Sequence, residues 1–175
     1  MTNHRFPVRS SDEYAAVRAF YGERTARRSG IAYMAHIDEG LDVLDLIGAS
    51  MTARLAFCLH PLAQADDDLP SFDPRCASSP DVLVAVIEYR NVANRYLAFH
   101  RGEPGRTARP SPLAVVNEML VADKVQNRKD FEDHHASTSD AVSERLAGYF
   151  AEWLEALGVD EAAYAGLAAA LRSRP

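Results

Sequence analysis

The sequence offers little support for a secreted, membrane-spanning or nucleic-acid-binding protein. Its only two cysteines, Cys58 and Cys76, have a spacing that matches no metal-binding motif, so we expect reduced thiols in a cytoplasmic protein. The longest unbroken apolar run, Val82–Ile87, has six residues, whereas a helix that spans a bilayer needs ~20. The polar residues 1–14 contain no apolar stretch of the kind that directs secretion.

Basic residues are too few for general nucleic-acid binding. The chain has 19 Lys and Arg against 25 Asp and Glu, a formal net charge of −6, whereas phosphate backbones are bound by basic faces. Apolar residues make up 47% and charged residues 25% of the 175 positions, the balance of a globular protein rather than a disordered one. A chain of this length suits one domain with one substantial core.

The spacing of apolar residues predicts helices along almost the whole chain. The expected helices cover about 12–28, 33–47, 51–62, 80–100, 112–135, 140–157 and 160–172. Typical capping residues precede three of them: Ser10–Asp12, Ser50 and Ser139–Asp140. Pro61 lies inside the third pattern, where it either bends or ends the helix.

Two segments rich in proline and charge, 66–81 and 101–112, are predicted to be irregular loops. Neither an internal repeat nor a β-hairpin signal occurs in the sequence. We therefore predict an all-α fold, a single-domain helical bundle with its core in about 12–158 and a C-terminal helix at 160–172.

Three polar residues stand in strongly apolar helical stretches, where a buried charge is costly unless it is paired or binds a metal. These residues are His36, His60 and Asp123. Two imidazoles and one carboxylate, contributed by three helices, could form part of a divalent-metal site. Either histidine taken alone is better explained by an ordinary core or surface position, and only the three residues together favour a site.

Two polar rows at helical spacing add to this pattern. The first has spacings of 4, 3 and 4 and consists of Asp123, Asn127, Asp130 and His134, flanked by Lys124 and Arg128. The second has spacings of 3 and 4 and consists of Glu88, Asn91 and Arg95. Either row could be a solvated helix face. The run 90–95 is more typical of the wall of a site, because asparagine is a poor helix former.

Four segments share their order and spacing with a known family. They are Gly30–His36, Leu59–His60, Leu120–Asn127 and Gly148–Trp153. In this order they resemble the HD-domain hydrolases, and most closely the small stand-alone (p)ppGpp hydrolases of the RelA/SpoT type. The resemblance covers about 12–158 and implies an HD-domain-like helical fold.

The resemblance also implies a manganese ion held by two histidines and two aspartates. His36, His60 and Asp123 occupy three of these positions. The fourth position, directly after the second histidine, is Pro61 here. The family also places two acidic residues three to four positions further on. In this sequence that stretch is Ala63–Ala65, with Gln64 in the middle, and contains no acidic residue.

Other carboxylates are candidates to replace the missing ligand. Asp66–Asp68 begin six residues after His60 and reach the same ion only if the chain turns back at Pro61. Glu39 lies one helical turn from His36, and Asp130 lies two turns from Asp123.

The function implied by the resemblance is metal-dependent hydrolysis of a phosphorylated nucleotide, with (p)ppGpp-type alarmones as one substrate class. The expected catalytic residues are Gln64, Asp67 and Asn127. The expected substrate-binding residues offer cations for phosphates or a ring for a base, and they are Arg24, Arg28, Tyr33, Arg95, Lys124 and Arg128.

Two other interpretations stay open at this point. Loss of the aspartate after His60 is also expected of a degenerate HD-type fold that binds a nucleotide or a partner protein without hydrolysing it. A purely structural bundle would leave the polar residues of its helices unexplained. The sequence leaves the oligomeric state open.

Overall fold

The part of the chain described by the computed structural model, residues 7–27, 29–99, 108–134 and 141–174, is built from helices. Within it the only β-pairing is an isolated bridge between Thr25 and Ala32. The α-helices are α1 (Asp12–Tyr21), α2 (Tyr33–Leu46), α3 (Met51–Gln64), α4 (Pro80–Phe99), α5 (Ala114–His134), α6 (Ala141–Ala156) and α7 (Glu161–Arg172). Three short 3₁₀ turns accompany them: η1 (Val8–Ser10), η2 (Leu69–Ser71) and η3 (Pro74–Cys76). The all-α, single-domain bundle predicted from the sequence is confirmed.

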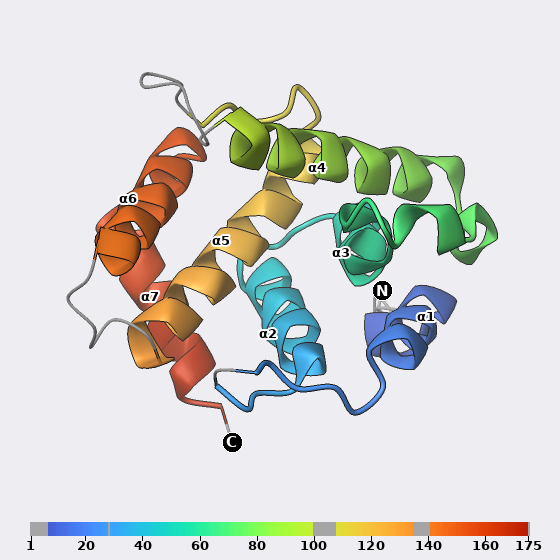
Figure 1. The fold of residues 1–175 in the computed structure, drawn as a ribbon, viewed down its shortest axis with the longest axis horizontal. Coiled ribbons are helices and arrows are strands. Elements are labelled where there is room, and N and C mark those ends of the chain that lie inside the picture. The colour runs from blue at the N-terminus through green and yellow to red at the C-terminus, as the bar shows by residue number, and fades with distance from the viewer. Residues whose placement is uncertain (1–6, 28, 100–107, 135–140, 175) are drawn as a thin grey trace, which may run out of the picture.

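The helix α5 runs through the middle of the bundle (Figure 1). It contacts α2, α3, α4, α6 and α7. On one side α3 packs against both α4 and α1, and on the other side α6 and α7 lie against α5. The three helices α2, α3 and α5 contact one another pairwise, so polar residues on their facing sides are brought close together.

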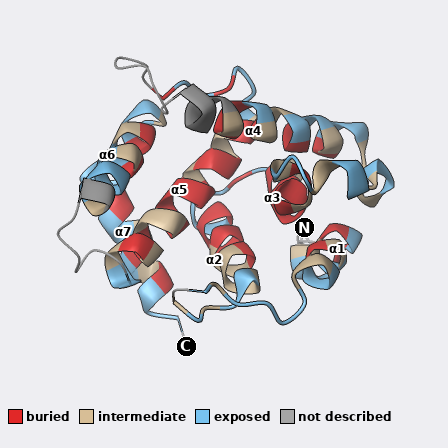
Figure 2. Ribbon diagram, in the orientation of Figure 1, coloured by how far each residue is buried: buried red, intermediate tan, exposed pale blue. Residues whose placement is uncertain are grey.

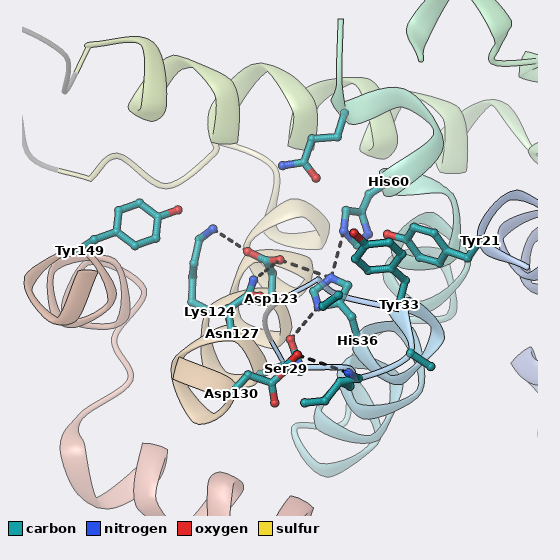
Figure 3. A pocket seen from close by; sticks show the side chains of 15 residues that line it. Tyr21, Ser29, Tyr33, His36, His60, Asp123, Lys124, Asn127, Asp130 and Tyr149 are labelled. Carbon is teal, nitrogen blue, oxygen red and sulfur yellow. Dashed lines mark hydrogen bonds and ion pairs between the residues drawn. The ribbon is translucent and has the colours of Figure 1, made fainter. Parts of the chain in front are cut away.

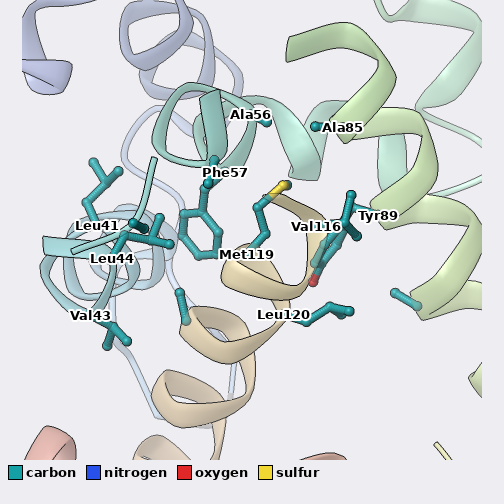
Figure 4. Packing of buried hydrophobic residues seen from close by; sticks show 14 of the residues in the cluster. Leu41, Val43, Leu44, Ala56, Phe57, Ala85, Tyr89, Val116, Met119 and Leu120 are labelled. Atoms are coloured by element: carbon teal, nitrogen blue, oxygen red, sulfur yellow. The ribbon is translucent and has the colours of Figure 1, made fainter. Parts of the chain in front are cut away.

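The hydrophobic core lies where these helices meet, and the outward faces of the helices are exposed (Figure 2). Phe57 of α3 and Met119 of α5 are both fully buried. Figure 4 shows the Phe57 ring between Leu41 and Leu44 of α2 and Met119 of α5. Burial of each such side chain contributes about 1.5–3 kcal/mol. The core therefore fixes the mutual positions of α2, α3 and α5.

The close approach of α2 to α3 depends on Gly40. A Cβ atom at this position would lie 2.2 Å from Cε1 of the Phe57 ring, a distance that packed carbon atoms do not reach. Only a residue without a side chain therefore permits this crossing.

Helix starts follow the capping residues. The side-chain oxygen of Ser11 accepts a hydrogen bond from the Tyr14 amide, and that of Ser50 accepts one from the Ala53 amide. Asp160 caps α7 in the same way. The cap expected at Ser139–Asp140 lies outside the described residues. These bonds satisfy amides that the first turn of a helix leaves without a partner.

Two helix ends differ from the expectations. The first helix was expected to reach about residue 28, but α1 ends at Tyr21 because Gly22 adopts a positive φ of 55° and turns the chain. The third helix continues through Pro61 to Gln64. In the described residues no helix is both long and apolar enough to cross a membrane.

Candidate metal centre

His36 of α2, His60 of α3 and Asp123 of α5 converge at one point (Figure 3). One ligand atom from each residue lies within 4.8 Å of the other two. The two Nε2 atoms are 3.3 Å apart, and His36 Nε2 lies 3.6 Å from Asp123 Oδ1. His60 and Asp123 are buried, whereas the His36 side chain is 19% exposed. The three residues form a group that could hold a metal ion.

Gln126 determines which nitrogen of His36 carries the proton. The amide nitrogen of Gln126 donates to Asp130 Oδ2 at 2.7 Å and to Glu39 Oε2 at 3.2 Å. Because carboxylates only accept, the amide oxygen of Gln126 must face the other way. This oxygen lies 2.7 Å from His36 Nδ1, so Nδ1–H donates to it. The lone pair of His36 is therefore on Nε2, which faces His60.

A backbone carbonyl determines the tautomer of His60. Its Nδ1 lies 2.6 Å from the Phe57 carbonyl oxygen, which can only accept, so Nδ1 carries the proton. The rings of Phe57 and Tyr89 pack against the imidazole, with centroids 4.6 and 4.8 Å away. Burial and the nearby His36 lower the pKa of His60 to about 3, which keeps the imidazole neutral at pH 7. The lone pair of His60 is likewise on Nε2.

Asp123 is ionised and fixed from both sides. Its Oδ1 accepts from Asn127 Nδ2 at 2.8 Å, and its Oδ2 lies 2.5 Å from Lys124 Nζ. Burial alone would raise the pKa of Asp123, but the Lys124 ammonium, together with the electrostatic effect of the two imidazoles, lowers it to about 2. Burial lowers the pKa of Lys124, yet the Asp123 carboxylate raises it above its usual range. The pair is therefore fully charged at pH 7.

These donors fit a divalent metal ion. Two unprotonated imidazole nitrogens and one carboxylate oxygen face a common point, and none of them brings a proton to it. Such acceptors repel one another unless a cation lies between them. A set of two imidazoles and a carboxylate is typical of first-row transition metals.

Lys124 is held by aromatic rings as well as by Asp123. Its Nζ lies 5.2 Å from the ring centroid of Tyr149 and 5.5 Å from that of Trp153, both on α6. Cation–π contacts of this kind stabilise a buried ammonium group. Helix α6 therefore contributes to the site although it supplies none of the three ligand atoms.

The three ligand residues lie in a cavity of about 380 Å³. Its other polar and aromatic lining residues are Tyr21, Ser29, Tyr33, Gln64, Lys124, Gln126, Asn127, Asp130 and Tyr149. A second cavity, of about 500 Å³, shares Tyr21, Tyr33 and Gln64 with the first and extends toward Arg24. The two cavities therefore adjoin along a wall made by these three residues.

The structure brings together most of the expected site residues. Four of them line the metal cavity beside the ligands: Gln64, Tyr33, Lys124 and Asn127. Arg24 lines the adjoining cavity, with its guanidinium carbon 4.9 Å from the Phe20 ring centroid. Arg28 and the side chain of Arg95 lie outside the described residues.

Asp67 and Arg128 are placed elsewhere. Asp67 is exposed and lines neither cavity, and neighbouring Asp66 pairs with Arg90. None of the three acids at 66–68 lines the metal cavity, because α3 continues past Pro61 instead of turning back. Arg128 pairs with Glu132 and Glu161 and lies over the Tyr164 ring, which joins α5 to α7.

Sequence reasoning missed Gln126, Tyr21 and Tyr149 as site residues. Gln126 follows Asp123 by three residues, and this spacing alone places it on the same side of α5. Tyr21 and Tyr149 were given no role in the site, and nothing in their spacing distinguishes a cavity wall from a core. Comparison of the chain with protein-family models, curated proteins and solved structures found no match.

Proposed function

We propose that this protein is a divalent-metal-dependent phosphohydrolase that acts on a phosphorylated nucleotide. The observation that carries the proposal is the convergence of three buried or half-buried groups: two imidazoles that carry their protons on the far nitrogen, and one ionised carboxylate. His36 and His60 present Nε2, and Asp123 presents a carboxylate oxygen, within 4.8 Å of one another. A divalent cation held there would lower the pKa of a water molecule and polarise a phosphoryl oxygen, which is the chemistry that phosphate-ester hydrolysis requires.

We propose Mn²⁺ as the metal, with His36, His60 and Asp123 as its protein ligands. Imidazole and carboxylate donors suit Mn²⁺, and three protein ligands leave positions open for water and substrate. The other carboxylate among the described residues that line this cavity, Asp130, is engaged elsewhere, since it accepts from Gln126 and pairs with Lys129. Its role is to orient Gln126.

Lys124 and Asn127 are the residues best placed to handle a phosphate beside the ligands. Both line the cavity and both are bonded to Asp123. An ammonium group offers three donors; Asp123 and Tyr149 engage two of them, and a phosphate oxygen is a suitable acceptor for the third.

Tyr33, Tyr21 and Arg24 support a nucleotide rather than a bare phosphate as the substrate. The two tyrosine rings lie 5.3 Å apart at the wall shared by the cavities, where a base could stack. The Arg24 guanidinium lies beyond them in the adjoining cavity, where its planar fork suits a second phosphate group.

One observation favours nucleotide binding without hydrolysis as a second candidate function. The residues that follow His60, from Pro61 to Ala65, carry no carboxylate, and the acids at 66–68 do not line the metal cavity. A carboxylate that activates the attacking water is therefore not supplied by this part of α3.

The decisive experiment measures the metal content of the protein and then its hydrolysis of nucleotides. Protein purified without chelator is analysed for bound metal and titrated with Mn²⁺, for wild type, His60→Ala and the control His134→Ala, an exposed histidine at the end of α5. We expect about one equivalent of metal in wild type and in the control, and none in His60→Ala. Absence of Mn²⁺ binding in wild type would overturn the proposal.

A panel of nucleoside di- and triphosphates and (p)ppGpp then separates the two functions. Mn²⁺-dependent phosphate release supports hydrolysis. Nucleotide binding to the metal-loaded protein without release of phosphate or pyrophosphate assigns the second function instead.

A further inference from the structure

Pro61 lies inside α3, one residue after a proposed metal ligand, and the helix continues beyond it to Gln64. In a regular helix the N–H of residue 61 would donate to the carbonyl of residue 57. Proline has no N–H, so this carbonyl loses its usual partner. Phe57 is fully buried, and a buried carbonyl without a partner is destabilising.

The partner that replaces the missing N–H is the His60 side chain. Its Nδ1–H donates to the Phe57 carbonyl at 2.6 Å, within the same turn of α3. This bond places the proton on Nδ1 and directs Nε2 toward His36 and Asp123. His36 is held differently, by the side chain of Gln126 from α5.

We propose that Pro61 is a positioning residue of the metal centre: by withholding an N–H it leaves the Phe57 carbonyl to His60 and so fixes His60 as an Nε2 ligand. Pro61 touches neither metal nor substrate in this role and acts only through His60. The inference rests on the proposed metal centre, but it does not depend on hydrolysis.

Pro61→Ala tests the role because it moves stability and metal binding in opposite directions. Alanine restores the N–H, which competes with His60 for the Phe57 carbonyl, so we expect Mn²⁺ affinity to fall about 10- to 100-fold, as for other residues that orient a ligand. The same change removes a residue unfavourable to helices. The thermal midpoint of the metal-free protein is therefore expected to rise by a few degrees.

Pro80→Ala is the matched control, because Pro80 is exposed at the start of α4, where proline deprives no helical carbonyl of its partner. It should leave Mn²⁺ affinity unchanged. An unchanged affinity in Pro61→Ala, or a joint fall of affinity and thermal midpoint in that variant, would overturn the proposal.

A second measurement is independent of metal binding. The ring ¹⁵N shifts of the metal-free protein, assigned with His60→Ala, report which nitrogen of His60 is protonated. We expect the Nδ1–H tautomer in wild type and a shift toward Nε2–H in Pro61→Ala. An Nε2–H tautomer in wild type refutes the positioning role. Mn²⁺ binding and ring shifts as expected, without release of phosphate from any nucleotide, would refute the proposed hydrolysis alone.

Discussion

The Nε2 atoms of His36 and His60 lie 3.3 Å apart, and each histidine carries its proton on the opposite ring nitrogen. One proton is held by a side-chain amide and the other by a backbone carbonyl, so the two rings are oriented by unrelated parts of the fold. A ligand pair that is already in the binding tautomer loses little conformational freedom when it takes up a cation. The contacts that set these tautomers should therefore affect metal affinity, as the ligands themselves do.

Replacement of Gln126 by leucine should weaken metal binding without removing a ligand. The variant has no acceptor for His36 Nδ1–H, which frees the ring to rotate or to change tautomer. We expect Mn²⁺ affinity to fall about 10- to 100-fold in isothermal titration. Asn91→Leu, which alters an exposed amide on α4, is the control and should bind Mn²⁺ as wild type does. Equal affinities for Gln126→Leu and wild type would show that the Gln126 contact does not orient His36.

Gly40→Ala should destabilise the protein, because the new methyl group overlaps the Phe57 ring. Its carbon would lie 2.2 Å from Cε1 and 2.3 Å from Cζ of Phe57. Overpacking of a core typically costs about 1–3 kcal/mol, which urea unfolding measures directly. Gly166→Ala in α7 is the matched control, since nothing lies within 4 Å of its added carbon. That variant should gain about 0.5–1 kcal/mol, because alanine is the better helix former. A stability of Gly40→Ala equal to or above that of wild type would show that the Phe57 ring moves aside, and would contradict this prediction.

The contribution of Glu13 to stability should depend on pH. Its Oε1 accepts from the Ser78 amide at 2.9 Å and ties α1 to the segment before α4. Burial alone would raise the pKa of Glu13, but the hydrogen bonds from Ser78 hold it below its usual value of 4.5. A lowered pKa means that the ionised group stabilises the fold above pH 4.5 and loses this effect as the pH falls.

Glu13→Gln is therefore expected to lower the free energy of unfolding by about 1 kcal/mol at pH 7. The difference from wild type should shrink as the pH falls from 4.5 through the lowered pKa of Glu13, because both side chains are neutral below that pKa. Glu23→Gln, at an exposed position, should show neither effect. A difference that persists unchanged at low pH would contradict the role of the charge.

The fold was largely predictable because helix caps and apolar periodicity are local properties of the chain. The boundaries of α2 and α7 agree with the expectations to within one residue. The end of α1 was wrong because Gly22, and not the later Gly30, is where the chain first leaves the helix. Both glycines adopt a positive φ, 55° at Gly22 and 72° at Gly30, and the sequence does not say at which of the two the helix ends.

The sequence predicted the three proposed ligands of the candidate site and four residues that line the cavity beside them, but not the contacts that orient these side chains. A histidine or aspartate in an apolar helix is visible in the sequence, and His36, His60 and Asp123 do lie together. The orientation of Gln126 follows from carboxylates on two helices, and the partner of Arg128 is Glu161, which is distant in sequence. Contacts of this kind depend on how helices cross, so spacing along one helix does not reveal them.

Phe57 combines two tasks that proteins often divide among several residues. Its ring fills the space that Gly40 leaves open, and its carbonyl orients His60. Any substitution that repacks this crossing also moves a metal ligand. If variants are selected only for heat resistance, the substitutions accepted around Phe57 should therefore often weaken metal binding. Engineering of this protein has more freedom at α7, which packs on α2 and α5 and supplies no residue to the metal cavity.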